Sequence, residues 1–451
     1  MVNSYTLNRD DNLLLLELKT DRVWGDGKPM TAQDVCFTID AILNPENPVP
    51  WAVDHRAALL GCSAPESNRV EIQFHRLPQT PQDWLMFSLL PSHRFASTTL
   101  PESHPIQTTT MGTHARRATL HADRLQVTPR KPLKKLKVKE IEVRPLTDVP
   151  AAIAAVERGE AHGIVALPQE YWAHAAQSER AYMRTYDQRT WWFVALNTEQ
   201  GVLTRAPLRQ ALDLLLDRKT MRQQLGPESY PQYEENPVME LISGPFVQSS
   251  PMYNRAVPVS SPDAAAAAAL LHTMGWQQVE GKWHDGSGPV VLRLGVAAQD
   301  EAALPGVAAA VEQQLQSAGF TVKTTTLAGK WPGRNPTVAN QFDLFIGQWS
   351  QRFMFPSVHH LLGAEGKDNL FGTQDPILTG LLAEAKQANT DVESRDAYHA
   401  LHEQLAHTHS MLFLWKRDQK SVWNHALRGF YLTNVHYYSG LHNAYWDTPA
   451  K

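Results

Sequence analysis

The N-terminal part of the sequence alternates between strand patterns and a helix pattern. Leu13–Leu18 is an apolar run that ends in alternating polar positions, which predicts a strand. Residues 25–29 then hold two glycines, an aspartate and a proline, a combination typical of a turn. Thr31 and Asp34 have the spacing of a capping box, and the apolar stripe that follows repeats about every 3.6 residues. We therefore predict a strand, a turn and a helix that ends at Asn44.

The rest of the chain continues this alternation. Residues 136–146 alternate as a strand, 149–159 have a helix pattern and 161–168 return as a strand, which together predict a βαβ crossover. The Pro-, Ser- and Asn-rich segment 226–260 predicts a long surface loop, and a second α/β block begins at residue 261. The whole pattern predicts an α/β fold with a parallel or mixed sheet. Further strands are predicted at 181–186, 191–197, 411–416 and 420–424.

Length and composition are those of an ordinary globular protein. With 451 residues the chain is too long for one core, so we expect two or more domains. Hydrophobic residues make up 43% of the chain, and no run of about eighteen apolar residues occurs. The net charge of -4 gives no general attraction to a polyanion, so we predict no nucleic-acid partner. The basic run at 129–140 is explained by a solvated loop and strand edge.

The cysteines and the N-terminus bear on the cellular compartment. Cys36 and Cys62 are too few for a disulfide scaffold or a four-cysteine zinc site, and the sequence leaves open whether they pair. Residues 1–19 show neither a basic start before an apolar core nor a small-residue cleavage site, so no secretory signal is visible. We therefore expect either a cytoplasmic protein or a chain that lacks its beginning.

Seven stretches of the sequence follow the order of recurring elements in one protein family. VWGDGKPMTAQDVCFTIDAI at 23–42 is similar to a strand, a DG-P-TA-DV turn and a helix, and FDLFIGQWS at 342–350 to a strand that leads into a GW pair. The other stretches are MGTHA at 111–115, AAIAAVERGEAHGI at 151–164, WWFVALNTEQGVLTRAPLRQAL at 191–212, PDAAAAAALLHTMGW at 262–276, and 369–405. Together they resemble family 5 of the bacterial extracellular solute-binding proteins, the dipeptide, oligopeptide and nickel receptors of ABC importers.

The resemblance implies a fold and a way of binding. Members have a two-lobed α/β fold like that of type II periplasmic binding proteins, with mixed sheets flanked by helices and a ligand cleft between lobes that close at a hinge. We expect residues 1–200 to form the first lobe, completed by 425–451, and residues 201–424 to form the second. Further strands normally open this family's first lobe, so we expect that lobe to be N-terminally incomplete.

One matched stretch departs from the family in its charge. In peptide-binding members, an aspartate three residues after the tryptophan of the GW stretch pairs with the amino terminus of the peptide. Counting from Trp349, this sequence has Ser350, Gln351 and Arg352 instead. An arginine binds a carboxylate or phosphate and repels an ammonium group. We therefore predict an anionic or neutral ligand.

Aromatic residues near the matched strands are further ligand candidates, because their flat side chains lose little entropy on binding. The alternative is that they belong to the core. Trp191 and Trp192 alternate across a strand, so they cannot both face the ligand. In MGTHA, histidine and alanine stand where the family has glycine and proline. The predicted ligand-binding residues are Trp349, Ser350, Gln351, Arg352, Trp192, Phe193, Thr113 and His114.

Metal binding and catalysis have weaker support. His399 and His402 stand about one helical turn apart, with His407 and His409 close behind, but no cysteine or acidic cluster joins them. A solvated helix face explains these histidines, so we predict no metal site and no cofactor. The sequence also has no G-x-S-x-G elbow, P-loop, G-x-G-x-x-G or H-E-x-x-H motif. We therefore predict a protein that is not an enzyme.

The predicted function is that of the substrate-binding component of an ABC transporter. Such a protein, expected to be a monomer, captures a peptide-like or other small solute between its lobes and delivers it to a membrane permease. The resemblance implies a periplasmic or cell-surface location. The alternative is a cytoplasmic ligand sensor, because the same module occurs in transcriptional regulators; an unrecognised hydrolase has the least support.

Overall fold

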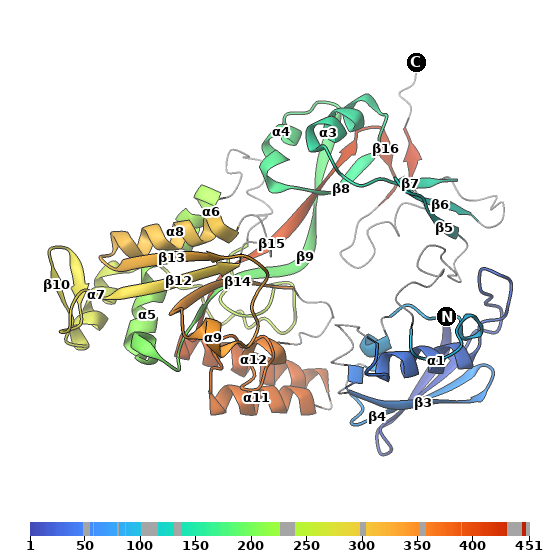
Figure 1. Cartoon of the computed structure of the whole chain (residues 1–451), viewed down its shortest axis with the longest axis horizontal. Helices are drawn as coiled ribbons and strands as arrows, with labels where there is room; N and C mark the ends of the chain where they lie inside the picture. Colours follow the sequence, from blue (N-terminus) through green and yellow to red (C-terminus); the bar gives the residue numbers. More distant parts are fainter. Residues whose placement is uncertain are drawn as a thin grey trace. The chain divides into compact units, whose positions relative to one another are not determined.

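The computed structural model divides the chain into two compact units (Figure 1). The first unit contains Met1–Ala152, Ala426–Leu432 and Tyr438–Lys451, and the second contains Ile153–His425 and Thr433–Tyr437. The structure describes residues 1–47, 55–56, 58–78, 81–85, 87–100, 116–129, 138–225, 240–297, 304–350, 358–388, 390–430 and 444–447.

The first unit is built on a four-stranded antiparallel sheet with the strand order β1-β2-β4-β3. Alternate side chains of β2 and β4 point to one face, which the helix α1 (Ala32–Leu43) covers with its apolar stripe. Two smaller sheets, β5-β6-β7 and β16-β17, complete the described part of this unit. The strands are β1 (Val2–Asn8), β2 (Leu13–Leu18), β3 (Leu59–Glu66), β4 (Arg69–Phe74), β5 (Arg116–Leu120), β6 (Leu125–Pro129), β7 (Ile141–Val143), β16 (Leu427–Arg428) and β17 (Tyr445–Trp446).

The predicted strand, turn and helix at 13–44 are confirmed, and Asp34 holds them together. Thr31 and Asp34 form the capping box at the start of α1. One oxygen of the buried Asp34 carboxylate accepts the backbone N–H of Thr31 (2.9 Å) and the indole N–H of Trp24 (3.0 Å). The other oxygen accepts the backbone N–H (2.8 Å) and the hydroxyl (2.7 Å) of Ser92. Four donors therefore compensate for the burial of one charge.

A disulfide bond joins Cys36 in α1 to Cys62 in β3. The sequence left this pairing open, because two cysteines at a separation of 26 residues say nothing about distance in space. The bond connects the helix to the edge strand of the sheet that it covers.

The second unit contains a six-stranded mixed sheet with the order β13-β12-β14-β9-β15-β8. β12 runs parallel to β13 and β14, whereas β9 is antiparallel to β14 and β15, and β8 is antiparallel to β15. The strands are β8 (Gly163–Leu167), β9 (Ala181–Leu196), β12 (Val291–Ala297), β13 (Thr321–Leu327), β14 (Leu344–Ser350) and β15 (Met411–Asn424).

Helices cover both faces of this sheet and create two hydrophobic cores. Trp192, Val194 and Leu196 of β9 enter the core beneath α5–α8, which we call core A. Trp191, Phe193 and Ala195 enter the core beneath α9–α12, which we call core B. The helices are α5 (Ala206–Leu215), α6 (Arg218–Leu225), α7 (Ala264–Thr273), α8 (Leu304–Ser317), α9 (Pro336–Ala339), α10 (His359–Leu362), α11 (Pro376–Gln387) and α12 (Asp391–Thr408).

Buried charged groups fix α5 and α6 to the start of β15. The guanidinium of Arg218 donates to the carbonyl oxygen of Phe413 over 2.6 Å and to the carboxylate of Asp213. His409 Nδ1 lies 3.1 Å from the other oxygen of that carboxylate. Burial alone would raise the pKa of Asp213, but the charge of Arg218 and the hydrogen bonds from His409 and Arg218 lower that pKa to about 2.

The predicted βαβ crossover is wrong. Its first strand, β7, pairs with β6, and its second strand, β8, pairs with β15 in a different sheet. The helix between them is present as α3 (Val149–Arg158), but it connects two sheets instead of two neighbouring strands. Periodicity identifies strands and helices, but it does not say which strands pair.

Strand lengths also differ from expectation. The predicted strand pairs 181–186 with 191–197 and 411–416 with 420–424 are continuous as β9 and β15. In the sequence, the first unit gives way to the second after Ala152, whereas the resemblance implied a lobe boundary after residue 200. Compact units need not coincide with the lobes of a family, so the lobe boundary after residue 200 stays a prediction.

Candidate functional site

The C-terminal end of β14 carries the residues of the predicted GW stretch, and the register of the sheet shows what lies beside them. Ser350 pairs with Thr190 of β9, which in turn pairs with Arg417 of β15. In the next row, Trp349 pairs with Trp191. Because directly paired residues point to the same face of a sheet, each row gathers side chains from neighbouring strands. We call this end of the sheet the β14 site.

On the core B face, the β14 site is aromatic. Trp331 lies against the backbone of Gly347, where a Cβ atom would come within 2.5 Å of the indole ring and within 2.7 Å of Phe193. The ring centroids of Trp331 and Phe193 are 5.4 Å apart, and the indole N–H of Trp331 donates to the carbonyl oxygen of Asp368 over 3.1 Å. Trp331 and Trp349 are both partly buried at the margin of core B. Glycine at 347 therefore permits an indole ring to approach the strand closely.

On the core A face, the β14 site is polar. The hydroxyl oxygens of Thr190 and Ser350 are 2.7 Å apart. Trp192 donates its indole N–H to Gln348 Oε1 over 3.4 Å, and the guanidinium carbon of Arg417 lies 5.8 Å from the centroid of a Trp192 ring. The site thus combines hydroxyl, amide and guanidinium groups with a buried aromatic support.

The structure brings together some of the predicted ligand residues. Trp349 is partly buried and Ser350 is exposed at the end of β14. Trp192 and Phe193 are each 0% exposed and belong to core A and core B respectively, so their contacts in this structure are those of core residues. Gln351, Arg352, Thr113 and His114 lie outside the described residues. Ligand contact by any of these eight residues stays a prediction.

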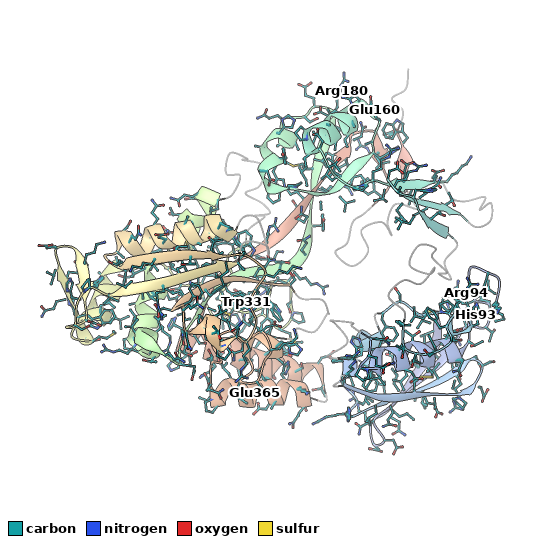
Figure 2. All side chains as sticks on the ribbon, viewed as in Figure 1. His93, Arg94, Glu160, Arg180, Trp331 and Glu365 are labelled. Carbon is teal, nitrogen blue, oxygen red and sulfur yellow. A yellow bond between two sulfur atoms is a disulfide. The ribbon has the colours of Figure 1, made fainter. Side chains whose placement is uncertain are left out.

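Sequence reasoning missed Trp331, Thr190 and Arg417. Trp331 belongs to a loop between β13 and α9, and Figure 2 shows it in the second unit. Glycine 347 inside an apolar strand was the available signal, since such a glycine often marks a close approach by another group. Thr190 and Arg417 join the site only through the register of three strands, which periodicity does not provide.

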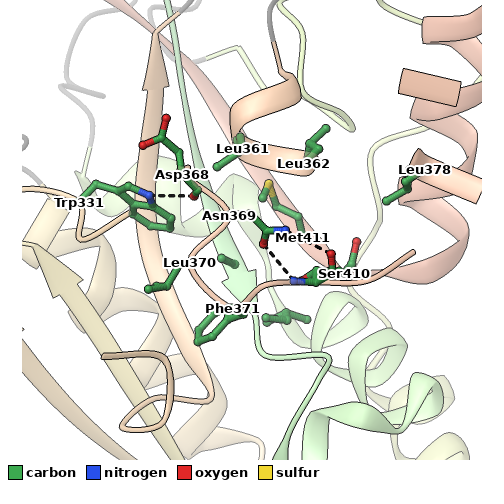
Figure 3. Close-up of a pocket in the computed structure, with 13 residues that line it drawn as sticks. Trp331, Leu361, Leu362, Asp368, Asn369, Leu370, Phe371, Leu378, Ser410 and Met411 are labelled. Carbon is green, nitrogen blue, oxygen red and sulfur yellow. Dashed lines mark hydrogen bonds between the residues drawn. The ribbon is translucent and has the colours of Figure 1, made fainter. Parts of the chain in front are cut away.

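A small pocket of about 20 Å³, partly open to solvent, lies near the start of β15 (Figure 3). Such a volume holds about one water molecule, so this cavity does not accommodate a solute. The side chain of Asn369 closes the loop beside it by donating to the carbonyl oxygens of Gly363 (2.9 Å) and Thr373 (3.2 Å). Ala195, Leu196, Trp331, Leu361, Leu362, Asp368, Asn369, Leu370, Phe371, Thr373, Leu378, Ser410 and Met411 line the cavity.

The histidines of α12 are engaged in packing. His402 is 0% exposed, and its Nδ1 accepts the backbone N–H of Asn254 over 3.2 Å. Its Nε2 therefore donates to the hydroxyl oxygen of Ser243, 3.1 Å away. Burial lowers the pKa of His402 to about 4, with a smaller contribution from His399. His399 Nε2 lies 3.1 Å from the carbonyl oxygen of Pro251.

These contacts do not form a nucleophile–base pair. The Ser243 hydroxyl donates to the carbonyl oxygen of Val257 over 2.8 Å, and His402 offers it a proton rather than a lone pair. Within the part of the chain that the structure describes, no group of three or more His, Cys, Asp or Glu side chains is placed to hold a metal ion.

Comparison with family models gives a match to the bacterial extracellular solute-binding proteins, family 5 Middle, over residues 1–359. The chain belongs to this family. It is therefore a solute-binding protein of the class that serves ABC transporters. No curated protein matches it.

Solved structures share the fold of this family 5 protein. NikZ from Campylobacter jejuni, in complex with Ni(L-His), is 16% identical with a TM-score of 0.76, covering 98% of this chain and 90% of NikZ. AppA from Bacillus subtilis, in complex with a nonapeptide, is 17% identical with a TM-score of 0.74, covering 100% and 90%. The ABC transporter substrate-binding protein CtaP from Listeria monocytogenes is 16% identical with a TM-score of 0.81, covering 99% and 90%.

The fold class expected from the sequence is confirmed, because these solved structures are periplasmic binding proteins of mixed α/β architecture. None of the comparisons supports the alternative of a cytoplasmic sensor. Among the described residues of this family 5 protein, helices long and apolar enough to cross a bilayer are absent.

Proposed function

We propose that this family 5 protein captures a peptide-like or anionic small solute reversibly, as a monomer, and delivers it to the permease of an ABC importer. The observation that carries this proposal is the family match over residues 1–359. Capture and delivery need binding energy but no change of covalent bonds, so we propose that the protein catalyses no reaction.

The chemistry of the β14 site supports binding of this kind. Trp349 and Trp331 offer partly buried flat surfaces, which can stack on a solute without losing much conformational entropy. Gln348 and Ser350 flank Trp349 along β14 and place polar groups on the other face of the strand. Small-molecule sites combine apolar walls with a few fixed polar groups in the same way.

We further propose that the protein works in the periplasm or at the cell surface. The Cys36–Cys62 disulfide supports this location, because such bonds persist in oxidising compartments and are rare in the cytoplasm of most organisms. The family description, extracellular solute-binding proteins, agrees with it.

Native mass spectrometry of freshly purified protein tests the proposed solute class. A retained small molecule should appear as a mass increment that is lost on unfolding. If none is retained, calorimetric titration should be run with mixed short peptides and with nickel plus L-histidine, because the similar proteins named above bind ligands of these two kinds.

A matched pair of variants makes this experiment specific. Trp349→Ala removes an indole from the β14 site and should weaken binding by about tenfold or more. Trp446→Ala removes an indole that is 41% exposed in the first unit and should leave affinity unchanged. Equal affinities for both variants would exclude the β14 site, and a solute converted to another product would contradict simple capture.

A further inference from the structure

The second unit has a further pocket, of about 490 Å³ and open to solvent, which shares no lining residue with the β14 site. Residues 249–251 and 253–256 line it together with His399 of α12. They belong to the Pro- and Ser-rich segment that follows α6, so a loop and a helix meet here. The volume lies within the range of about 300 to 1,000 Å³ that is usual for small-molecule sites. None of the lining side chains is acidic, whereas Arg255 is a cation.

The base of this pocket is formed before any ligand binds. Asn254 is 6% exposed, its backbone N–H donates to His402 Nδ1 over 3.2 Å, and its side-chain amide donates to the Glu403 carboxylate over 2.8 Å. The amide oxygen of Asn254 accepts the backbone N–H of Ala256 over 3.0 Å. The residues on both sides of Arg255 are therefore fixed by hydrogen bonds, so binding does not require the backbone at this point to become ordered.

Arg255 presents most of its guanidinium group to solvent. Its side chain is exposed, and Nη2 donates to the carbonyl oxygen of Gln248 over a long 3.3 Å. Within the described part of the chain, no carboxylate pairs with Arg255, and its other guanidinium N–H groups make no hydrogen bond. By contrast, the exposed Arg395 of α12 lies 2.8 Å from the carboxylate of Asp396. A planar fork with several free donors suits a group that has two or more oxygen acceptors.

Two hydroxyl groups line the pocket beside this cation. The exposed Ser249 hydroxyl has no hydrogen-bond partner among the described residues. The Ser250 hydroxyl oxygen accepts the backbone N–H of Met252 over 3.2 Å, and its proton has no acceptor in the same described set. His399 Nε2 donates to the carbonyl oxygen of Pro251 over 3.1 Å, which ties the loop to α12. Both serine protons are therefore available to a ligand.

We propose that this pocket is a second binding site, which takes a small molecule through a carboxylate or phosphate group held by Arg255 and the hydroxyls of Ser249 and Ser250. The guanidinium can donate two parallel hydrogen bonds to such an oxyanion, and the serines donate to its remaining lone pairs. The inference goes beyond the proposed capture at the β14 site and does not depend on it, because the two sites have no residue in common.

Calorimetric titration of the full chain tests this assignment. Inorganic phosphate and succinate are titrated separately at low ionic strength, with chloride as the only other anion. We expect at least one of them to bind, and their relative affinities show whether the pocket prefers phosphate or carboxylate. Arg255→Gln should weaken binding at least about tenfold. Arg205→Gln is the matched control, because Arg205 is an exposed arginine of the same unit that also donates to a backbone carbonyl oxygen, that of Met274 over 3.1 Å.

A second variant keeps the test valid if Arg255→Gln does not fold. Ser249→Ala removes an exposed hydroxyl that makes no hydrogen bond within the described residues, so it should leave the fold intact and weaken anion binding severalfold. Thermal unfolding gives an independent measurement, since a ligand that binds only the folded protein raises its Tm. Trp349→Ala should keep the full anion-dependent rise in Tm, because Trp349 does not line this pocket.

Three results would overturn the second site. The first is that neither phosphate nor succinate binds the wild-type protein. The second is that Arg255→Gln and Ser249→Ala keep the wild-type affinity, which would indicate an adventitious ion only. The third is that Trp349→Ala loses the anion while Arg255→Gln retains it, which would assign the anion to the β14 site. Each of these results leaves the proposed solute capture standing, because that function is tested by solute retention and not by these anions.

Discussion

The buried His402 makes stability depend on pH in a way that can be calculated. Burial lowers the pKa of His402 to about 4 in the folded protein, whereas an exposed histidine titrates near 6.5. At pH 7.5 the side chain is neutral in both states, and its hydrogen bonds to Asn254 and Ser243 are intact. As the pH falls below 6.5, the unfolded chain binds a proton that the folded protein excludes, so stability is lost between about pH 6.5 and pH 4.

The size of this loss follows from the two pKa values. At pH 5 the unfolded histidine is almost fully protonated and the folded one is mostly neutral, which corresponds to about 2 kcal/mol less stability than at pH 7.5. Urea unfolding of the full chain at both pH values, followed by tryptophan fluorescence, measures the difference. Other groups titrate too, so the quantity of interest is the wild-type change minus that of a variant without the histidine.

His402→Gln should remove about 2 kcal/mol of the pH-dependent change, although it lowers stability at every pH by disrupting the contacts of the ring. His407→Gln is the matched control, because it removes an exposed histidine from the same helix and should leave the pH-dependent change as in the wild type. If His402→Gln and the wild type lost equal stability between pH 7.5 and pH 5, the assignment of a neutral, hydrogen-bonded His402 would be refuted.

Three other predictions concern the disulfide, the strand glycine and the charge at 352. Replacing both cysteines of the Cys36–Cys62 bridge with alanine should lower the free energy of unfolding by about 3 to 4 kcal/mol, since the bridge spans 26 residues; a loss under about 1 kcal/mol in urea unfolding would contradict this. Gly347→Ala should destabilise by about 1 to 3 kcal/mol because its Cβ would lie 2.5 Å from an indole atom, whereas Gly380→Ala, with nothing within 4 Å, should be neutral or stabilising in thermal unfolding. Arg352→Asp should shift preference toward solutes with a free amine; equal affinity of both proteins for peptides and their N-acetylated forms would count against it.

Local patterns predicted local structure well. The capping-box spacing of Thr31 and Asp34 located the start of α1, because caps and turns depend on residues close together in the sequence. The same reasoning could not find the Ser92 contacts that complete the hydrogen bonding of Asp34, since these come from residues 58 positions away. Nor could it assign β7 and β8 to different sheets.

The candidate site was predicted only where it is contiguous in the sequence. The resemblance of 342–350 to a family strand that leads into a GW pair placed Trp349 and Ser350 at the end of a strand. Trp192 and Phe193 were both predicted to contact the ligand. Helices cover both faces of β9, so side chains that point to either face are buried in a core. Arg417 is the instructive omission, because a single arginine in the run WKRDQK has no feature that marks it as buried.

The length of β9 and β15 has a mechanical consequence. β9 has 16 residues and β15 has 14, and the two strands run side by side through two parts of the sheet. In one part β9 also pairs with β14, and in the other β15 also pairs with β8. Between those parts, the described sheet narrows to a ribbon of two strands, and there the register shifts next to Arg417. A narrow, irregularly bonded ribbon twists and bends at a lower elastic cost than a wide sheet covered by helices, so deformation of this unit concentrates beside the β14 site.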